Sequence, residues 1–164
     1  MYIINIMKRI MVQRKPRKYA IIDDADFKQL SQYHWNVAGG KKGSGYYAAY
    51  RKGDKPVYMH RLIMDAPEGV EVDHINHNKL DNRRSNLRLC NSHQNKLNMK
   101  LRSDNTTGHK GLRWRDDVKS WRVNVKIHGK EIQVGYFKKK RDAIRARREA
   151  EVIYYGEFAS RQLT

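Results

Sequence analysis

The sequence predicts an α+β protein built from two small domains, and three stretches of the chain support this prediction. Residues 70–101 have the order strand, polar loop, strand, helix. Residues 108–160 show three strands followed by one helix. Between them, residues 102–107 are mostly Ser, Asp, Asn and Thr, which is typical of a linker. The length of 164 residues allows one ordinary domain or two small ones.

The N-terminal part of the chain is expected to be a scaffold. Residues 1–18 are basic, and we expect a loosely ordered extension there. Residues 19–22 predict a strand, after which Asp23 or Asp24 can cap a short helix.

Further short elements are predicted before residue 65. Residues 35–37 and 46–51 predict paired strands joined by a glycine-rich turn at 39–45. Residues 56–59 predict another strand, and residues 60–64 a short helix.

Polar residues concentrate in the middle of the chain. The pair Asp73-His74 follows a stretch in which valines alternate, which predicts a strand that ends at a loop. Residues 76–85 are rich in Asn, Asp and Arg, whose side chains favour turns. Residues 86–89 predict a second strand, and the helix expected after it covers residues 93–101.

These residue types suit metal-assisted hydrolysis of a phosphodiester. A neutral imidazole with a pKa near 6.5 can accept a proton from water at physiological pH. Carboxylate and amide oxygens are ligands that Mg²⁺ prefers, and it often takes only one or two protein groups. A structural zinc site is excluded because it needs four Cys or His ligands with paired spacing, and Cys90 is the single cysteine.

The same stretch resembles the HNH nucleases of the ββα-metal type, in the version found in phage and mobile-intron homing endonucleases. The resemblance implies a nuclease domain over residues 19–101 with its ββα-metal core at about 70–101. The matching residues are His60-Arg61-Leu62, Val72 to Asn76, Asp81-Asn82, Ser85 to Arg88 and Gln94-Asn95.

The resemblance implies a role for each motif residue. His74 would be the general base, and Asn86 would hold the strand that carries the imidazole. Asp73 and Asn95 would bind a divalent metal, with Mg²⁺ the expected ion and Mn²⁺ the alternative. The third motif letter is Asn here, and His93 is a competing candidate two positions earlier.

The charge of the chain indicates a polyanionic partner. Lys and Arg number 35 against 17 Asp and Glu, giving a formal charge of +18, which favours nucleic acid. His60 and Arg61 are further candidates for phosphate contacts. No run of 18 apolar residues is present, so we expect no transmembrane helix. A single cysteine fits a reducing compartment, and we expect a cytoplasmic location, in a bacterial host if the chain is phage-encoded.

The last third of the chain predicts a sheet covered by a helix. Residues 121–127 alternate strictly between apolar and polar side chains, and strands are also predicted at 111–115 and 131–137. A helix is predicted at residues 138–155. Its expected apolar stripe consists of Ala143, Ala146, Ala150 and Ile153.

This segment, residues 108–160, resembles the AP2 DNA-binding domain. The residues that carry the resemblance are Gly111-Leu112-Arg113, Trp121, Gly135-Tyr136-Phe137, Ala143, Ala146 and Tyr155 to Ala159. In that family the sheet enters the major groove, which accommodates a β-ribbon. The contacts implied for double-stranded DNA are Arg113, Arg115, Arg122, Asn124, Lys126 and Gln133.

The sequence therefore predicts a metal-dependent DNA endonuclease of the HNH homing type, from a phage or mobile element. One active site per chain implies that a monomer on DNA would nick one strand. The alternative is a non-catalytic, sequence-specific DNA-binding protein or regulator with a decayed nuclease half. The presence of all four motif residues, Asp73, His74, Asn86 and Asn95, argues against decay.

Overall fold

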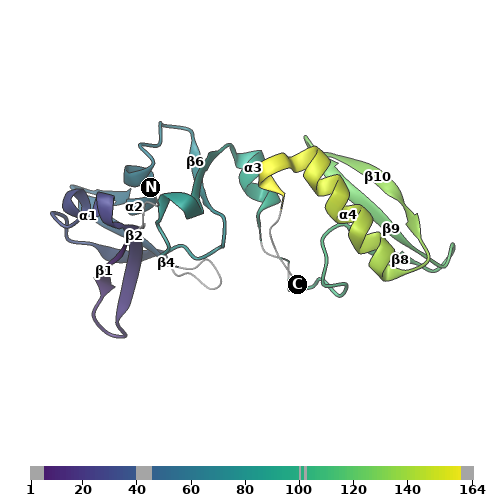
Figure 1. Cartoon of the computed structure of the whole chain (residues 1–164), viewed down its shortest axis with the longest axis horizontal. Coiled ribbons are helices and arrows are strands. Elements are labelled where there is room, and N and C mark those ends of the chain that lie inside the picture. The colour runs from purple at the N-terminus through teal and green to yellow at the C-terminus, as the bar shows by residue number, and fades with distance from the viewer. Residues whose placement is uncertain (1–5, 40–45, 100, 102, 160–164) are drawn as a thin grey trace. The chain divides into compact units, whose positions relative to one another are not determined.

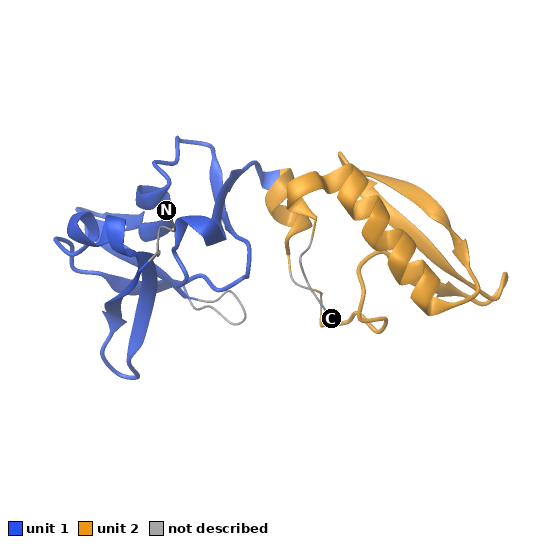
Figure 2. Ribbon diagram, in the orientation of Figure 1, with its two compact units in different colours: residues 1–92 blue, residues 93–164 orange. Residues whose placement is uncertain are grey.

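The computed structural model describes residues 6–39, 46–99, 101 and 103–159, and the chain divides into two compact units (Figures 1 and 2). Unit 1 covers residues 1–92 and unit 2 covers residues 93–164. Both contain small antiparallel sheets and helices, so the protein is α+β. The division falls between Ser92 and His93, and not in the polar stretch 102–107 where a linker was expected.

A β-hairpin begins at Met7, so residues 7–18 are not the loosely ordered extension that was expected, and residues 1–5 of that extension lie outside the described residues. Strand β1 (Met7–Gln13) pairs antiparallel with β2 (Lys18–Asp23). Val12 is buried and Ile10 packs against the core, so burial of apolar side chains holds the basic segment in place.

A short helix follows the hairpin. Helix α1 (Asp24–Leu30) begins after Asp23, whose position is the predicted cap. The Asp23 side chain does not cap the helix, because its Oδ2 accepts a hydrogen bond from the backbone N–H of Arg84 (2.8 Å). This bond joins the N-terminal scaffold to the segment that precedes β7.

A second sheet of unit 1 has three strands in the order β3-β4-β5. They are β3 (Asn36–Gly39), β4 (Tyr46–Lys52) and β5 (Lys55–Tyr58), all antiparallel. The glycine-rich turn was predicted at residues 39–45; Gly39 ends β3, and residues 40–45 lie outside the described residues. Helix α2 (Met59–Ile63) follows β5 directly.

The strand–loop–strand–helix order expected at residues 70–101 is present. Strand β6 (Glu71–His74) pairs antiparallel with β7 (Leu87–Cys90), and the short 3-10 helix η1 (Arg84–Asn86) leads into β7. Helix α3 (Ser92–Leu97) ends four residues earlier than predicted.

The core of unit 1 joins this motif to the scaffold. Ile22, Leu30 and Met59 are among its fully buried side chains, each of which contributes roughly 1.5–3 kcal/mol by burial. Val72 from β6 and Leu87 from β7 belong to the same cluster. The motif strands are therefore packed on the same core as the N-terminal hairpin.

After residue 108, unit 2 has the expected three strands followed by one long helix. Its sheet has the order β10-β9-β8, built from β8 (Leu112–Arg115), β9 (Ser120–Ile127) and β10 (Lys130–Phe137). Helix α4 (Lys140–Tyr155) packs on the sheet, and the short 3-10 helix η2 (Gly156–Phe158) ends the described elements.

The buried stripe of α4 differs from the prediction at two positions, because Ala146 is only half-buried and Ile153 is exposed. The side chains buried along it are Ala143, Arg147 and Ala150, whereas Ile153 is 75% exposed. At 3.6 residues per turn, position 153 lies roughly 80° from Ala143 around the helix axis, so Ile153 leaves the stripe. Within the part of the chain that the structure describes, no helix combines the length and apolar character needed to span a membrane.

Candidate active site

Three of the four predicted motif residues lie close together in unit 1. Asp73 and His74 are the last two residues of β6, and Asn86 ends η1 just before β7. All three are buried. The β6–β7 register places Asp73 opposite Arg88 and His74 opposite Leu87. Asn95 and the competing candidate His93 are on α3, in the part of the helix that belongs to unit 2.

A buried asparagine orients the imidazole of His74. The His74 Nε2 atom lies 3.1 Å from Oδ1 of Asn82, and both side chains are almost fully enclosed. The Asn82 Nδ2 atom points to Met59 Sδ and to the carbonyl oxygen of Leu80, which are both acceptors. The amide oxygen therefore faces His74, so Nε2 carries the ring proton and Nδ1 is the nitrogen that can accept one.

The surroundings of His74 keep its imidazole neutral. Burial is the largest effect and lowers the pKa of His74 below its usual 6.5, although the bond to Asn82 and the carboxylates of Asp73 and Asp81 act in the opposite direction. A general base must be unprotonated before it reacts. The lowered pKa of His74 leaves it in this form at neutral pH.

A second imidazole lies beside the first. The ring centroids of His60 and His74 are 5.1 Å apart, and the Tyr47 ring lies 5.2 Å from His60 and 6.1 Å from His74. Burial lowers the pKa of His60 to about 3, and electrostatic interactions with His74, Arg61 and Lys79 act in the same direction. His60 is therefore neutral at any pH at which the protein would work.

Arg61, the other predicted phosphate contact, is engaged within the protein. Its guanidinium donates hydrogen bonds to the backbone carbonyls of Ala66, Pro67 and Val70. This arrangement holds the loop that leads into β6. The geometry favours a structural role for Arg61 over a phosphate contact.

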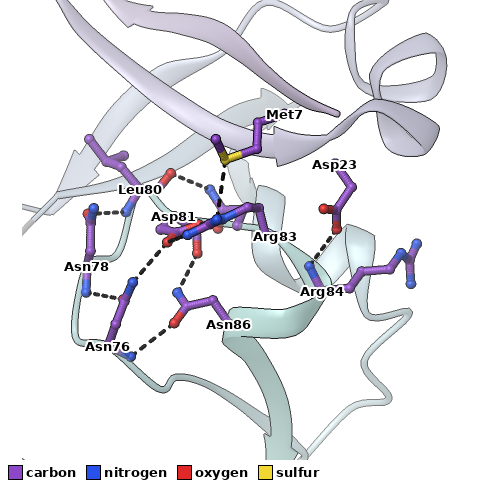
Figure 3. A network of polar contacts seen from close by, with 10 residues as sticks. Met7, Asp23, Asn76, Asn78, Leu80, Asp81, Arg83, Arg84 and Asn86 are labelled. Atoms are coloured by element: carbon purple, nitrogen blue, oxygen red, sulfur yellow. Dashed lines mark hydrogen bonds and ion pairs between the residues drawn. The ribbon is translucent and has the colours of Figure 1, made fainter. Parts of the chain in front are cut away.

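Asn86 closes the loop between the two motif strands. Its Oδ1 accepts the backbone N–H of Asn76 (3.0 Å), and its Nδ2 donates to the carbonyl of Asp81 (2.7 Å), as Figure 3 shows. The backbone carbonyl of Asn86 accepts the N–H of Ile75 (2.9 Å). One asparagine thus fixes both ends of the loop that follows His74.

Asp81 anchors the same loop from inside. Its carboxylate accepts hydrogen bonds from Asn76 Nδ2 (2.8 Å) and from Nε and Nη2 of Arg83 (2.7 and 2.6 Å) (Figure 3). Burial alone would raise the pKa of Asp81, but the bonds from Arg83 and Asn76 outweigh it and lower that pKa. Asp81 is therefore ionised at neutral pH and holds the loop through charge-assisted bonds.

Asp73 forms a buried ion pair. Arg88 donates from both Nε (2.9 Å) and Nη2 (2.7 Å) to the same carboxylate oxygen, Oδ2. The oxygen donors of Asp73 and Asn95 suit Mg²⁺, which takes few protein ligands and keeps several waters. No group of three or more His, Cys, Asp and Glu side chains able to hold a metal occurs among the described residues. Oxygen ligands of these two types suit a hard, partly hydrated cation better than zinc.

The six residues predicted to contact DNA share one face of the unit 2 sheet. In the strand register Arg113 lies opposite Arg122, Asn124 opposite Gln133, and Lys126 opposite Glu131. The opposite face carries Leu112 and Val123, which pack against α4.

Several of these side chains already have partners. Asn124 Nδ2 donates to Glu131 Oε1 (2.7 Å), and Arg122 lies 3.7 Å from the same carboxylate. Arg115 forms two bonds to Asp117. A DNA phosphate would therefore compete with Glu131 and Asp117 for these groups.

Two residues of the site were missed by sequence reasoning. Asn82 was part of the quoted motif without a role, and Arg88 lay in the predicted second strand. An asparagine in a loop rich in Asn and Asp carries no sign that it is buried. The spacing of Asp73 and Arg88 suggests a pair only once the β6–β7 register is known.

Comparisons with known proteins agree with this geometry. Residues 57–97 match a family described as HNH endonuclease. The chain is 42% identical over 65 residues to Protein 3.8 of Escherichia phage T7, covering 40% of this chain and 54% of that protein. It is 41% identical over 83 residues to the uncharacterized HNH endonuclease L560 of Acanthamoeba polyphaga mimivirus, covering 48% of this chain and 42% of that protein.

The chain thus spans about half the length of the curated relatives it matches. No solved structure matches. Residues 57–97 form an HNH endonuclease domain, which confirms that part of the predicted resemblance. The family match ends at residue 97, so the AP2-like assignment of residues 108–160 stays a prediction.

Proposed function

We propose that this chain is a DNA endonuclease that hydrolyses phosphodiester bonds with the help of a divalent metal. The observation that carries the proposal is the state of His74 within an HNH domain. It is neutral, buried and held through Nε2 by Asn82, which leaves Nδ1 as the basic atom.

In the proposed reaction, Nδ1 of His74 accepts a proton from the attacking water. The imidazole stays in place because Asn82 holds its other nitrogen and Asn86 closes the loop behind it. Asp73 and Asn95 are the residues that would hold the metal. When bound, a divalent ion supplies charge neutralisation at the phosphate and the leaving oxygen.

Double-stranded DNA is the proposed substrate. The charge of +18 and the row of cationic and amide side chains on the unit 2 sheet support this choice. We place the protein in a phage or mobile element, where it would act inside the host cell as a homing-type nuclease. Viral relatives support this setting. A chain acting as a monomer would nick one strand, because it carries one His74 site.

A second candidate function is non-catalytic DNA binding. It is favoured by the ion pair at Asp73, because Arg88 already neutralises the carboxylate that would face a metal. Such a protein would bind DNA through unit 2 and leave it intact.

The decisive experiment compares nicking of supercoiled plasmid with Mg²⁺ and with EDTA. We expect metal-dependent conversion to nicked circle, and a rate roughly 10²–10⁴-fold lower for His74→Ala, since a general base contributes about this factor. DNA affinity should change less than twofold. His34→Ala, an exposed histidine of unit 1, is the matched control and should keep the wild-type rate.

Two results would contradict the proposal. Equal rates of nicking by the wild type and His74→Ala would show that His74 is not the general base. DNA binding without nicking by any variant, over a range of plasmid sequences and metals, would favour the non-catalytic candidate.

A further inference from the structure

We propose that unit 2 positions α3, the last helix of the HNH domain, and with it Asn95. The two residues that would do this are His128 and Lys110, which lie outside the HNH match. The inference rests on the proposed function only for its effect on cleavage. The anchoring of the helix is independent of it.

Helix α3 is too short to be stable by itself. It has six residues, and each keeps part of its surface exposed. Isolated helices shorter than about 12–15 residues are marginal in water. The position of Asn95 therefore depends on the contacts that hold this helix.

The first contact is made by two stacked imidazoles. The rings of His93 on α3 and His128 are 5.3 Å apart with an angle of 19° between their planes. His128 and Gly129 form the two-residue turn between β9 and β10, with φ angles of 45° and 82°. Such a turn favours Asn and Gly at its first position. A histidine there has a conformational cost, which the stacking contact offsets.

The second contact is at the other end of the helix. The Lys110 ammonium donates a hydrogen bond to the carbonyl of Leu97 (3.0 Å) and another to the carbonyl of Met99. The last carbonyls of a helix lack partners within it, and a cation at this end is favourable. Lys110 thus caps α3 from unit 2.

Lys110 is itself fixed to α4. Its backbone carbonyl accepts a hydrogen bond from Arg147 Nε (3.0 Å), and Arg147 forms an ion pair with Glu151 (2.9 Å). Burial lowers the pKa of Lys110, while the nearby Glu151 acts to raise it. The half-buried cap on α3 is therefore tied to α4 through the backbone of Lys110.

Asn95 lies between these two attachment points. In sequence it is the last residue of the HNH motif, yet residues 93–97 of its helix belong to unit 2, and both contacts lie within that unit. We therefore expect mutations at His128 and Lys110 to act on metal-dependent cleavage through α3.

Hydrogen exchange tests the anchoring directly. His128→Asn removes the ring but suits the turn, and Lys110→Met removes the ammonium but keeps the stem. We expect the amides of residues 96–99 to exchange at least about tenfold faster in either full-length variant, with exchange in β9 unchanged. Lys130→Met and His34→Asn, both at exposed positions, should exchange like the wild type.

Unchanged exchange at residues 96–99 in both variants would overturn the anchoring. Faster exchange in β9 as well would show general unfolding of unit 2. In that case His93→Ala, which removes the same stacking from the α3 side and suits a helix, decides the question. Exchange at residues 96–99 like the wild type would then overturn the stacking contact.

The Mg²⁺ dependence of nicking tests the effect on Asn95. We expect the half-saturating Mg²⁺ concentration to rise at least about fivefold in both variants, with DNA affinity within twofold of wild type. An unchanged Mg²⁺ dependence together with a loosened α3 would overturn the positioning of Asn95. Absence of nicking by the wild type would instead refute the proposed function, and the exchange result would still decide the anchoring.

Discussion

At His74, burial and hydrogen bonding act on the imidazole in opposite directions. Burial has the largest effect and lowers the pKa of His74. The Asn82 side chain partly offsets this because its Oδ1 accepts a hydrogen bond from Nε2–H. The rate of a base-catalysed step follows the neutral fraction of the imidazole. The acidic limb of the rate profile should therefore lie below pH 6.5. His60, with a pKa of about 3, should not add a second limb.

Asn82→Asp should shift this limb to higher pH. A carboxylate about 3 Å from Nε2 stabilises the imidazolium and raises the pKa of His74, by roughly 1–3 units for a close opposite charge. More base is then protonated at a given acidic pH, so the rate falls there. Single-turnover nicking between pH 5 and 9 measures the shift.

Asn78→Asp is the control for this change, because Asn78 is exposed in the same loop. An aspartate there would still accept the hydrogen bond from the backbone N–H of Leu80. Its profile should match the wild type. An Asn82→Asp profile that also matches the wild type would contradict the assigned contact.

At the scale of elements, the motif loop depends on the N-terminal hairpin. The backbone of Ile21 in β2 donates to the carbonyl of Leu80 and accepts the N–H of Asn82, both at 2.8 Å. These bonds place Asn82 where it can reach His74. The hairpin is therefore part of the machinery that orients the base.

Asp23→Ala should weaken this connection. Buried Asp23 accepts the backbone N–H of Arg84, and losing one partner of a buried hydrogen bond costs roughly 1–3 kcal/mol. Asp24→Ala removes the adjacent, exposed carboxylate, whose pair with Lys8 is worth roughly 0–1 kcal/mol. Denaturant unfolding of both variants gives the comparison. If both variants lost the same free energy of unfolding, the hydrogen bond between Asp23 and the Arg84 backbone would not have the expected stabilising effect.

In unit 2, the close approach of β8 and β9 near α4 requires a glycine. Gly111 has a φ of +67°, and a Cβ there would lie 2.2 Å from the carbonyl oxygen of Asn124 and 2.9 Å from Arg147 Nε. Gly111→Ala should therefore destabilise unit 2 by more than about 2 kcal/mol.

Gly129→Ala separates strain from collision. Gly129 also has a positive φ of +82°, but a Cβ there would have no heavy atom within 4 Å. Gly129→Ala should lower the free energy of unfolding only by the cost of placing alanine in the left-handed conformation, roughly 1–2 kcal/mol. Thermal unfolding of unit 2, followed by the fluorescence of its tryptophans, compares the two. Equal losses would show that the collision is relieved by a small shift.

At the scale of the whole molecule, the net charge of +18 should dominate DNA affinity. Lys126→Ala should weaken binding and lower the slope of log K against log salt by about one unit if Lys126 neutralises one phosphate. Its cross-strand neighbour carries the opposite charge, so Glu131→Gln should strengthen binding.

Titration of a short duplex between 50 and 300 mM salt measures both effects. Lys28→Ala, which removes an exposed charge from α1, is the control. An unchanged salt slope for Lys126→Ala would show that Lys126 does not contact a DNA phosphate.

Local patterns were enough to predict much of this protein. Alternating valines before Asp73-His74 and a loop rich in Asn and Asp indicate strand, turn and strand, because these preferences act between near neighbours. The alternation at residues 121–127 indicated a half-buried strand for the same reason. The excess of basic residues indicated a polyanionic partner, which requires no fold at all.

Tertiary structure alone decided the details of the site. The contact of Asn82 with His74, the burial of His60 and the pairing of Arg88 with Asp73 each depend on how separate strands and loops pack. Strand β1 is ordered because its apolar side chains Val12 and Ile10 pack in the core of unit 1. Helix α3 is the last part of the HNH match in sequence, but a helix of six residues depends on the contacts that pack against it. Its residues 93–97 belong to unit 2, where His93 stacks on His128 and the Leu97 carbonyl accepts a hydrogen bond from Lys110.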